Sequence, residues 1–339
     1  MKPTKHVSAE SRMAGTSHLE MIQALAHKIR LRAVAAVLAT VLGIIGSPCL
    51  GFGQVQLPSV NLGGSNFEDA FGAPGWLLQE FVEGDFANEL KDSRGETVPG
   101  PNRITAYSAT THVVFVSQRH VLGGWLAGEI LQPMADIDVQ LANRPRSRVR
   151  GLADLTAGVG FQWAPTKLGD GVFADRLILD FGLPTGKYSD TNAVNIGNNA
   201  VVVEPFYAFT YEIKNIEFSA RFHYLWNSVN HDPFVGFGVR NVQAGQAVHV
   251  NYSVSYEVQK NVRVGLNGYW LQQVTKDEVN GVPIANSLER TVGLGLGLQI
   301  QDKNIWYHLN GYEEFDVRNR SRGAKVIFRL SIALPSPKV

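Results

Sequence analysis

Apolar and polar side chains alternate with a period of two residues along most of this 339-residue chain. The segment 200–213 shows the pattern most clearly, because one face is mainly apolar and aromatic and the other carries the charges. A period of two indicates β-strands with two unlike faces. No window after the N-terminal region approaches 18 consecutive apolar residues, so the sequence predicts no transmembrane helix there. The chain is therefore expected to be all-β.

The composition is more typical of a β-barrel in a membrane than of a soluble domain. Charged residues make up only 18% of the chain, aromatic residues make up 10%, and glycine occurs 34 times. The formal net charge of +1 gives no indication of a nucleic-acid partner.

The alternation predicts twelve strands, of which the first three are the least regular. They are expected at 76–90, 103–117, 121–139, 150–164, 172–184, 200–213, 216–228, 246–258, 262–275, 288–301, 304–314 and 323–334. Short links at 118–120, 165–171, 214–215, 259–261 and 302–303 alternate with longer links at 91–102, 140–149, 185–199, 229–245, 276–287 and 315–322. Short periplasmic turns and long extracellular loops are typical of outer-membrane barrels.

Register across the short links gives a second argument, because directly opposed residues of an antiparallel pair share a face. Folding about these links pairs apolar residues with each other: Ile213 with Ile216, Val258 with Val262, Ile300 with Ile305, and Trp163 with Phe173. On the other face, Glu257 meets Arg263 and Gln299 meets Trp306.

The apolar face is therefore expected to meet lipid, and the polar face to line a lumen. Leu177, Leu179, Phe181, Tyr207, Phe209 and Tyr211 are predicted to face lipid. Because open sheet edges cannot face lipid, the strands must close on themselves. We predict an antiparallel transmembrane β-barrel of about 12 strands at 76–335, and a soluble β-sandwich is the alternative.

The N-terminal region predicts export. Three basic residues precede the apolar run 33–45, and the small-x-small sequence at 51–53 offers a cleavage site before Gln54. We predict a signal peptide at 1–53, with an over-extended start because Met21 would begin an ordinary one; a short membrane anchor is the alternative. The lone Cys49 would be removed with it, which leaves no thiol for a disulfide or a metal.

Two further segments complete the predicted domain organisation. Residues 54–75 are rich in Gly, Pro and Asn and show no periodicity, so we expect a periplasmic leader segment there. Residues 336–339 form a short C-terminal tail. The barrel itself is expected in the outer membrane of a Gram-negative bacterium.

Several motifs resemble a known family. They are G-L-A-D-L-T-A-G-V-G-F-Q-W at 151–163, F-G-L-P-T-G-K-Y at 181–188, N-I-G-N-N at 195–199 and E-P-F-Y-A-F-T-Y at 204–211. They are similar to the family named for the MetA-pathway of phenol degradation, over roughly residues 74–334. That resemblance implies an outer-membrane β-barrel, transporter-like, associated with the catabolism of aromatic compounds. It brings no catalytic residues.

Polar residues on the predicted lumen face are the candidate solute contacts. They are Arg176, Asp180, Glu204, Glu212, Glu217, Arg221, His223, His249, Glu257, Arg263, Trp306, His308, Lys325 and Arg329. A selectivity surface is the functional interpretation. A hydrogen-bonded network that stiffens the barrel is the structural one, and the mixture of signs argues against strong ion selectivity.

Two pairs of titratable residues give little support for a metal-binding or catalytic site. Glu212 and Glu217 face each other across a turn, where a carboxylate pair can bind a cation or serve structure. His223 and His249 lie on neighbouring strands in a register that the loop leaves open, and the sequence places no third ligand beside them. We therefore predict no metal, no cofactor and no catalytic residue.

Two further features argue against a catalytic or phosphate-binding site. A Ser–His hydrolase is disfavoured because His249 and Ser253 are about 13 Å apart along a strand, at about 3.3 Å per residue. Gly293, Gly295 and Gly297 alternate with leucines, so they read as lumen-facing positions that leave room inside the wall.

These observations predict an outer-membrane channel or transporter for a small hydrophobic or aromatic compound. Passage would be passive diffusion through a mixed polar lumen, gated by extracellular loops or by the leader. The alternatives are a sealed structural or surface-binding barrel and, less favoured, an outer-membrane lipid hydrolase. The expected partners are outer-membrane lipid, the solute, and the periplasmic chaperones and barrel-assembly machinery used during biogenesis. The sequence leaves the oligomeric state open.

Overall fold

The structure is a computed structural model that describes residues 55–142 and 144–335. The predicted signal peptide at 1–53, Cys49 and the tail at 336–339 lie outside the described residues.

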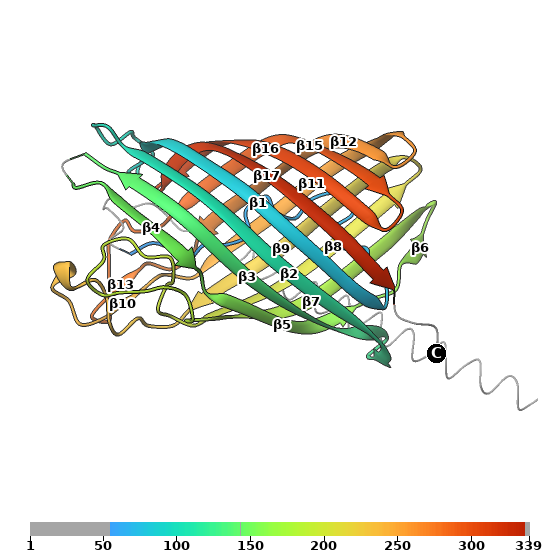
Figure 1. The fold of residues 1–339 in the computed structure, drawn as a ribbon, viewed down its shortest axis with the longest axis horizontal. Coiled ribbons are helices and arrows are strands. Elements are labelled where there is room, and N and C mark those ends of the chain that lie inside the picture. Colours follow the sequence, from blue (N-terminus) through green and yellow to red (C-terminus); the bar gives the residue numbers. More distant parts are fainter. Residues whose placement is uncertain (1–54, 143, 336–339) are drawn as a thin grey trace, which may run out of the picture.

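A closed antiparallel β-barrel makes up most of the molecule (Figure 1). Its wall consists of β1 (Gly75–Leu90), β2 (Arg103–Val121), β3 (Gly124–Gln140), β4 (Ser147–Leu152) continued by β5 (Leu155–Gln162), β7 (Gly171–Leu183), β8 (Val202–Ile213), β9 (Ile216–Asn227), β11 (Ala247–Gln259), β12 (Val262–Gln273), β15 (Arg290–Asp302), β16 (Ile305–Arg318) and β17 (Ser321–Pro335). The first strand pairs with both β2 and β17, which closes the wall. With β4 and β5 taken as one interrupted strand, the predicted twelve-stranded barrel is confirmed.

Minor elements lie at the two ends of the barrel. At the short-turn end, β6 (Thr166–Leu168) extends the sheet beside β7. At the long-loop end, β10 (Val242–Gln243), β13 (Glu278–Val279) and β14 (Val282–Pro283) form a separate small sheet, and η1 (Val235–Phe237) is one 3-10 turn. Within the described ranges, no helix is long and apolar enough to cross a membrane.

Two links differ from the prediction. The expected turn at 118–120 belongs to β2, and the chain turns at Leu122 and Gly123 instead, both with positive φ (53° and 77°). Positive φ at both central residues suits the right-handed twist of a two-residue hairpin, but leucine gives no such signal in the sequence. The expected long link at 315–322 is also wrong, because β16 and β17 extend until only Asn319 and Arg320 join them.

The predicted strand 150–164 is interrupted at Ala153 and Asp154. The Asp154 carboxylate accepts hydrogen bonds from the backbone nitrogens of Gly186 and Asn198, each at 2.8 Å. These bonds tie the long loop 184–201 to the wall at the point where the ladder breaks. The free edge of β4 is partly covered by this loop, since the Lys187 backbone nitrogen donates to the Leu152 carbonyl at 2.9 Å.

The expected register is correct at some turns and wrong at others. Ile213 opposes Ile216, Glu212 opposes Glu217, and Glu257 opposes Arg263, as the sequence predicts. The other pairs are wrong: Gln259 opposes Val262, Asp302 opposes Ile305, Gln299 opposes His308, and Thr166 opposes Phe173. A bulge follows Glu257, and the hairpin between β15 and β16 is tighter than expected, so each shift arises from turn geometry rather than from the strand pattern.

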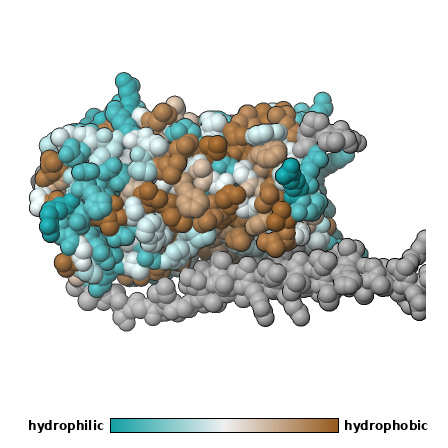
Figure 2. All heavy atoms as spheres, turned by 90° about the horizontal axis from the view of Figure 1, so that it is seen from below, coloured by the Kyte–Doolittle hydropathy of each residue, from teal (hydrophilic) through white to brown (hydrophobic). Residues whose placement is uncertain are grey.

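The outside of the barrel carries an apolar band. Figure 2 shows apolar residues over the middle and the short-turn end of one face, and hydrophilic residues gathered at the long-loop end. Trp76 lies against Phe115 with ring centroids 4.7 Å apart and planes tilted by 42°, and Phe86 meets Tyr107 edge-on at 5.7 Å. Trp76 and Phe86 are about 33 Å apart along β1 at about 3.3 Å per residue, or roughly 25 Å along the barrel axis at a tilt of about 40°.

That spacing matches the apolar height of outer-membrane barrels, and the two aromatic pairs stand where aromatic girdles are found. Most of the predicted lipid-facing residues are exposed or half-exposed on this surface. Tyr207 differs, because it is buried and its hydroxyl donates to the outward-facing Asp175 carboxylate at 3.0 Å. A polar contact therefore lies within the apolar face. Asp175 occupies a position that the alternation assigns to that face.

Candidate functional site: the barrel lumen

The N-terminal leader lies inside the barrel. The sequence predicts a periplasmic segment at 54–75, but residues 57–70 pack against inward-facing side chains of the wall. At the long-loop end, the Leu57 backbone nitrogen donates to the Glu289 carboxylate at 2.9 Å. The chain then runs the length of the lumen and enters β1 at Gly75, beside the short turns.

Gly63 anchors this leader to the wall of the barrel. Its φ is +86°, and a Cβ atom there would lie only 2.8 Å from the Tyr312 ring. The Tyr312 hydroxyl donates to the Gly63 carbonyl at 2.7 Å, and the Gly63 nitrogen donates to Asn251 at 2.8 Å. Only glycine can adopt this backbone angle and also tolerate the close approach of the Tyr312 ring. We therefore interpret Gly63 as a point at which the leader docks on the wall.

Two acidic leader residues make the charged contacts with the wall. Asp69 lies 2.7 Å from Nη2 of Arg221 and 3.1 Å from Nη2 of Arg176. Burial by itself raises the pKa of the Asp69 carboxyl, but the two guanidinium groups outweigh it and lower that pKa to about 2. Glu68 lies 3.0 Å from Nε of Arg263, and its backbone nitrogen donates to Glu217 at 3.0 Å.

Most of the sequence-predicted lumen residues take part in this inner network. Those that line the main cavity are Arg176, Asp180, Glu204, Arg221, His223, Trp306, His308 and Arg329. Others contact the leader or a neighbour on the inner wall: Glu212, Glu217, His249, Arg263 and Lys325. Glu257 lies at the rim, where its carboxylate accepts the Asn261 backbone N–H at 2.9 Å. Which of them contact a solute stays a prediction.

A cavity of about 910 Å³ remains beside the leader. The leader forms one side, and β1, β2, β3, β5 and β7 form much of the other. Its lining reaches Lys303 and Asn304 at a short turn and Ile196 and Asn198 in a long loop at the opposite end. The cavity therefore extends from one end of the barrel to the other.

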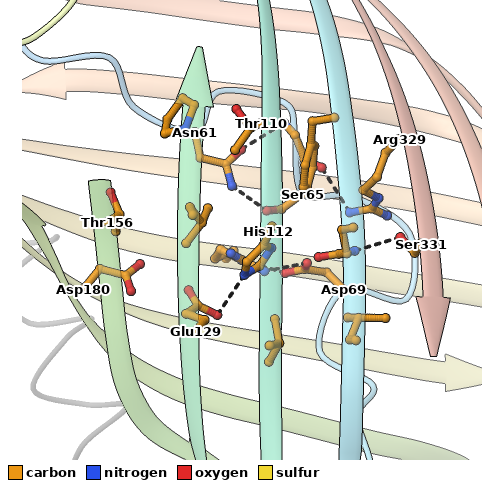
Figure 3. Close-up of a pocket in the computed structure, with 18 of the residues that line it drawn as sticks. Asn61, Ser65, Asp69, Thr110, His112, Glu129, Thr156, Asp180, Arg329 and Ser331 are labelled. Carbon is orange, nitrogen blue, oxygen red and sulfur yellow. Dashed lines mark hydrogen bonds and ion pairs between the residues drawn. The ribbon is translucent and has the colours of Figure 1, made fainter. Parts of the chain in front are cut away.

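The first three strands contribute lumen residues that the sequence analysis missed. The clearest are His112 and Glu129, whose Nε2 and Oε2 atoms lie 3.4 Å apart, with Asp180 on the neighbouring wall (Figure 3). Glu83 and Asp85 also line the cavity and both contact Lys325, at 2.7 and 3.2 Å. The polar residues at every second position of 108–112 were the available signal, but irregular alternation in these strands concealed it.

The glycines of β15 do face inward, but the space they leave is filled. A Cβ at Gly293 would lie 2.3 Å from the Tyr269 ring, and one at Gly297 would lie 2.8 Å from leader residue Phe67. These glycines therefore admit an aromatic side chain of the wall and one of the leader, rather than enlarging the cavity.

The two histidines whose register the sequence leaves open are directly opposed. Their rings stack with centroids 4.0 Å apart, and both have a ring nitrogen near Oε1 of Glu204. The structure thus places a carboxylate beside His223 and His249 that sequence spacing does not. Ser253, by contrast, makes no hydrogen bond to any described residue through its hydroxyl, so it lacks the contact that a serine nucleophile requires.

Fold, apolar band and polar lumen together define an outer-membrane β-barrel. The chain belongs to the family described as "Putative MetA-pathway of phenol degradation", whose model matches residues 87–330. The family resemblance of the sequence motifs is thereby confirmed.

Solved structures with the same fold include an outer membrane channel from Pseudomonas putida F1. It has a TM-score of 0.70 and 13% identity, and the match covers 81% of this chain and all of that one. A mutant of the monoaromatic hydrocarbon channel TodX matches with a TM-score of 0.45 and 10% identity, over 85% of this chain and 99% of that one. The β domain of the Bordetella autotransporter BrkA matches at 0.42 and 11%, over 78% and 100%. No curated protein matches the sequence.

Proposed function

We propose that the protein is an outer-membrane channel that passes a small hydrophobic or aromatic compound by diffusion through the lumen, beside the leader. The observation that carries this proposal is the cavity of about 910 Å³, whose lining reaches both ends of the barrel. A sealed structural barrel would need no such path.

The lining supports a compound with an apolar body. Val114, Val116, Leu131 and Ile137 lie on the wall of the cavity, together with Phe81. A few polar groups among apolar side chains is the usual composition of a small-molecule site. Many lumen charges are paired with an opposite charge, as Asp69 is with Arg221, so the proposed path carries little net field to select ions. The family name adds a link to phenolic compounds.

The leader is the proposed gate. It occupies much of the lumen, and it is held by hydrogen bonds, ion pairs and apolar packing rather than by strand pairing. Releasing it would break these contacts but leave the wall intact, whereas removing a strand would open the wall. Movement of residues 57–70 would widen the cavity without any change in the barrel. Outer-membrane lipid and the periplasmic assembly machinery are the other proposed partners, and no catalytic role is proposed.

The test is solute flux through purified barrel in liposomes. Swelling rates are measured with phenols, aromatic acids, short alkanols and sugars of similar size, beside protein-free liposomes. Uptake by cells lacking the gene is compared with uptake by complemented cells. We expect faster entry of the aromatic solutes. Equal rates with and without the protein, for every solute, would reject the channel and favour the sealed or surface-binding barrel.

A further inference from the structure

Glu204, His223 and His249 form a compact cluster of potential metal ligands on the inner wall. They come from three consecutive wall strands, β8, β9 and β11. One ligand atom from each lies within 4.8 Å of the others. His249 and His223 have side-chain exposures of 0% and 2%, and Glu204 has 15%.

The separations suit an ion between these atoms. Nδ1 of His223 lies 2.7 Å from Oε1 of Glu204, and Nε2 of His249 lies 3.0 Å from the same oxygen. Two ligands each about 2.1 Å from a zinc ion at the tetrahedral angle are separated by about 3.4 Å, so both separations would have to lengthen by less than about 1 Å. Little rearrangement is therefore needed to surround an ion with two imidazole nitrogens and one carboxylate oxygen.

Hydrogen bonds among the described residues leave three ring nitrogens of the cluster without a partner. The short contact of His223 to Glu204 is not aligned as a hydrogen bond, and neither ring nitrogen of His223 has a hydrogen-bond partner among the described residues. Nδ1 of His249 also lacks a partner in that part of the chain. Buried polar atoms without partners are rare and call for an explanation, such as a bound ion.

The surrounding charges favour a cation. The two rings stack 4.0 Å apart between centroids and 13° from parallel, so both imidazoles face the same small space beside the Glu204 carboxylate. Asp180 lies directly opposite Glu204 in the ladder between β7 and β8, which adds a second carboxylate nearby. The positive charge of Arg221 is bound by Asp69 through two hydrogen bonds, at 2.7 and 2.8 Å.

An entry path exists, because Glu204 and His223 both line the main cavity. We propose that Glu204, His223 and His249 bind one divalent transition-metal ion, of the zinc, copper or cobalt class. Two imidazoles with one carboxylate is a ligand set found in metal sites of proteins, and it leaves a coordination position open toward the cavity. The proposal does not depend on the identity of the transported solute, or on transport itself.

The experiment uses the mature chain without a polyhistidine tag, refolded in detergent and freed of metal. Equilibrium dialysis against Zn²⁺ gives stoichiometry and affinity, and Co²⁺ gives a visible d–d spectrum. We expect one equivalent per barrel and at least a tenfold loss of affinity in His223→Gln, His249→Gln and Glu204→Gln. His308→Gln is the matched control, because this buried lumen histidine contacts Arg329 and lies outside the cluster.

A second readout covers variants that fail to fold. Cu²⁺ bound to the unsubstituted protein should give an electron paramagnetic resonance spectrum with hyperfine structure from two imidazole nitrogens, and Zn²⁺ should raise the thermal unfolding temperature because the site joins three strands. Less than one bound equivalent, a spectrum without nitrogen ligands, or equal affinity in the wild type and the folded cluster variants would overturn the proposal.

Discussion

Single residues decide whether the leader stays in the lumen, and Gly63 is the clearest of them. Its positive φ and its contact with the Tyr312 ring leave no room for a side chain. Asp69 has the corresponding electrostatic role, because it forms ion pairs with Arg176 and Arg221 at the inner wall. Both act on the same equilibrium, between a docked leader and one displaced from the wall.

Gly63→Ala should loosen the leader without disturbing the wall. Strain at positive φ and displacement of the Tyr312 ring together should destabilise docking by about 1–3 kcal/mol. The expected result is faster proteolytic cleavage within 57–70 and faster swelling of liposomes. Gly281→Ala is the matched control, since Gly281 has a φ of +77° but open space where the Cβ would lie. Equal effects of the two substitutions would show that packing against Tyr312 is unimportant.

Asp69 should make leader docking sensitive to acid. Its pKa is lowered from 3.8 in the unfolded chain to about 2 in the folded protein. The stabilisation is therefore fully present above about pH 4 and is lost as the pH falls through 2, and it amounts to roughly 2 kcal/mol. Channel conductance should rise in that window. In Asp69→Asn the lumen is left with unpaired guanidinium groups, so conductance should already be high at pH 6 and change less on acidification.

At the scale of elements, the long-loop end depends on one buried carboxyl group. Asp277, between β12 and β13, accepts hydrogen bonds from the Gly245 nitrogen at 2.9 Å and from Nε2 of Gln273 at 2.7 Å. Burial raises its pKa from 3.8 to about 7, against the lowering effect of the Gly245 hydrogen bond. A group with a raised carboxyl pKa loses stability as the pH increases from about 4 through 7.

The loop that carries the small sheet should therefore be looser at pH 8 than at pH 5. Asp277→Asn, which cannot ionise, should remove that difference and protect the loop at pH 8. Amide hydrogen exchange in 274–289 measures the effect, after correction for the intrinsic pH dependence of exchange. Exchange at the other end of β8, where Ile213 opposes Ile216 across a short turn, should not respond to the substitution. If the variant and the wild type show the same corrected pH dependence, another group controls the loop.

The leader as an element can be locked in place. The Ala70 nitrogen lies 3.0 Å from the Thr210 hydroxyl, so cysteines at these two positions are close enough to test for a disulfide. The predicted mature chain contains no cysteine to compete. If the leader moves during transport, oxidised Ala70→Cys/Thr210→Cys should reduce solute flux and a reductant should restore it. The single variant Thr210→Cys controls for the substitution, and unchanged flux in the locked barrel would exclude leader movement at this point.

At the scale of the whole molecule, wall and leader are separable. The contact between β1 and β17 extends from Gly75 to Leu90, which closes the barrel without any contribution from residues 55–74. Deleting 55–74 should therefore leave a folded barrel with a larger conductance. It also removes Glu68 and Asp69 while Arg176, Arg221 and Arg263 remain, so the open pore should prefer anions.

Reversal potentials in a KCl gradient measure that preference, with the full-length barrel as the reference. We expect weak selectivity in the complete protein and a shift toward chloride after the deletion. A cation preference in the deleted form would mean that Glu129, Asp180 and Glu204, rather than the arginines, control the field of the open lumen.

The sequence predicted the parts of this structure that depend on local patterns. Alternation of period two located the later strands and distinguished their lipid and lumen faces, because a strand residue keeps its side regardless of its partner strand. It failed at the 122–123 and 319–320 hairpins, where only one of the two central residues, Gly123 or Asn319, is a usual turn residue. It also missed His112 and Glu129, because the first strands alternate poorly.

The site required the tertiary structure. The ladder that brings His223 beside His249, and Glu204 beside both, depends on a register set across a long loop, which spacing along the chain does not contain. The same holds for the leader, whose Gly63, Glu68 and Asp69 have partners 100 or more residues away.

The sequence alone determined a membrane barrel of twelve strands with a lipid face and a polar lumen, because these follow from side-chain periodicity and link length. Only the tertiary structure decided that the leader fills the lumen, that a cavity of about 910 Å³ remains beside it, and that two histidines meet a carboxylate on the wall. The physical reason is that the position of the leader and the register across long loops depend on contacts between residues far apart in the chain, whose free energies no local pattern encodes.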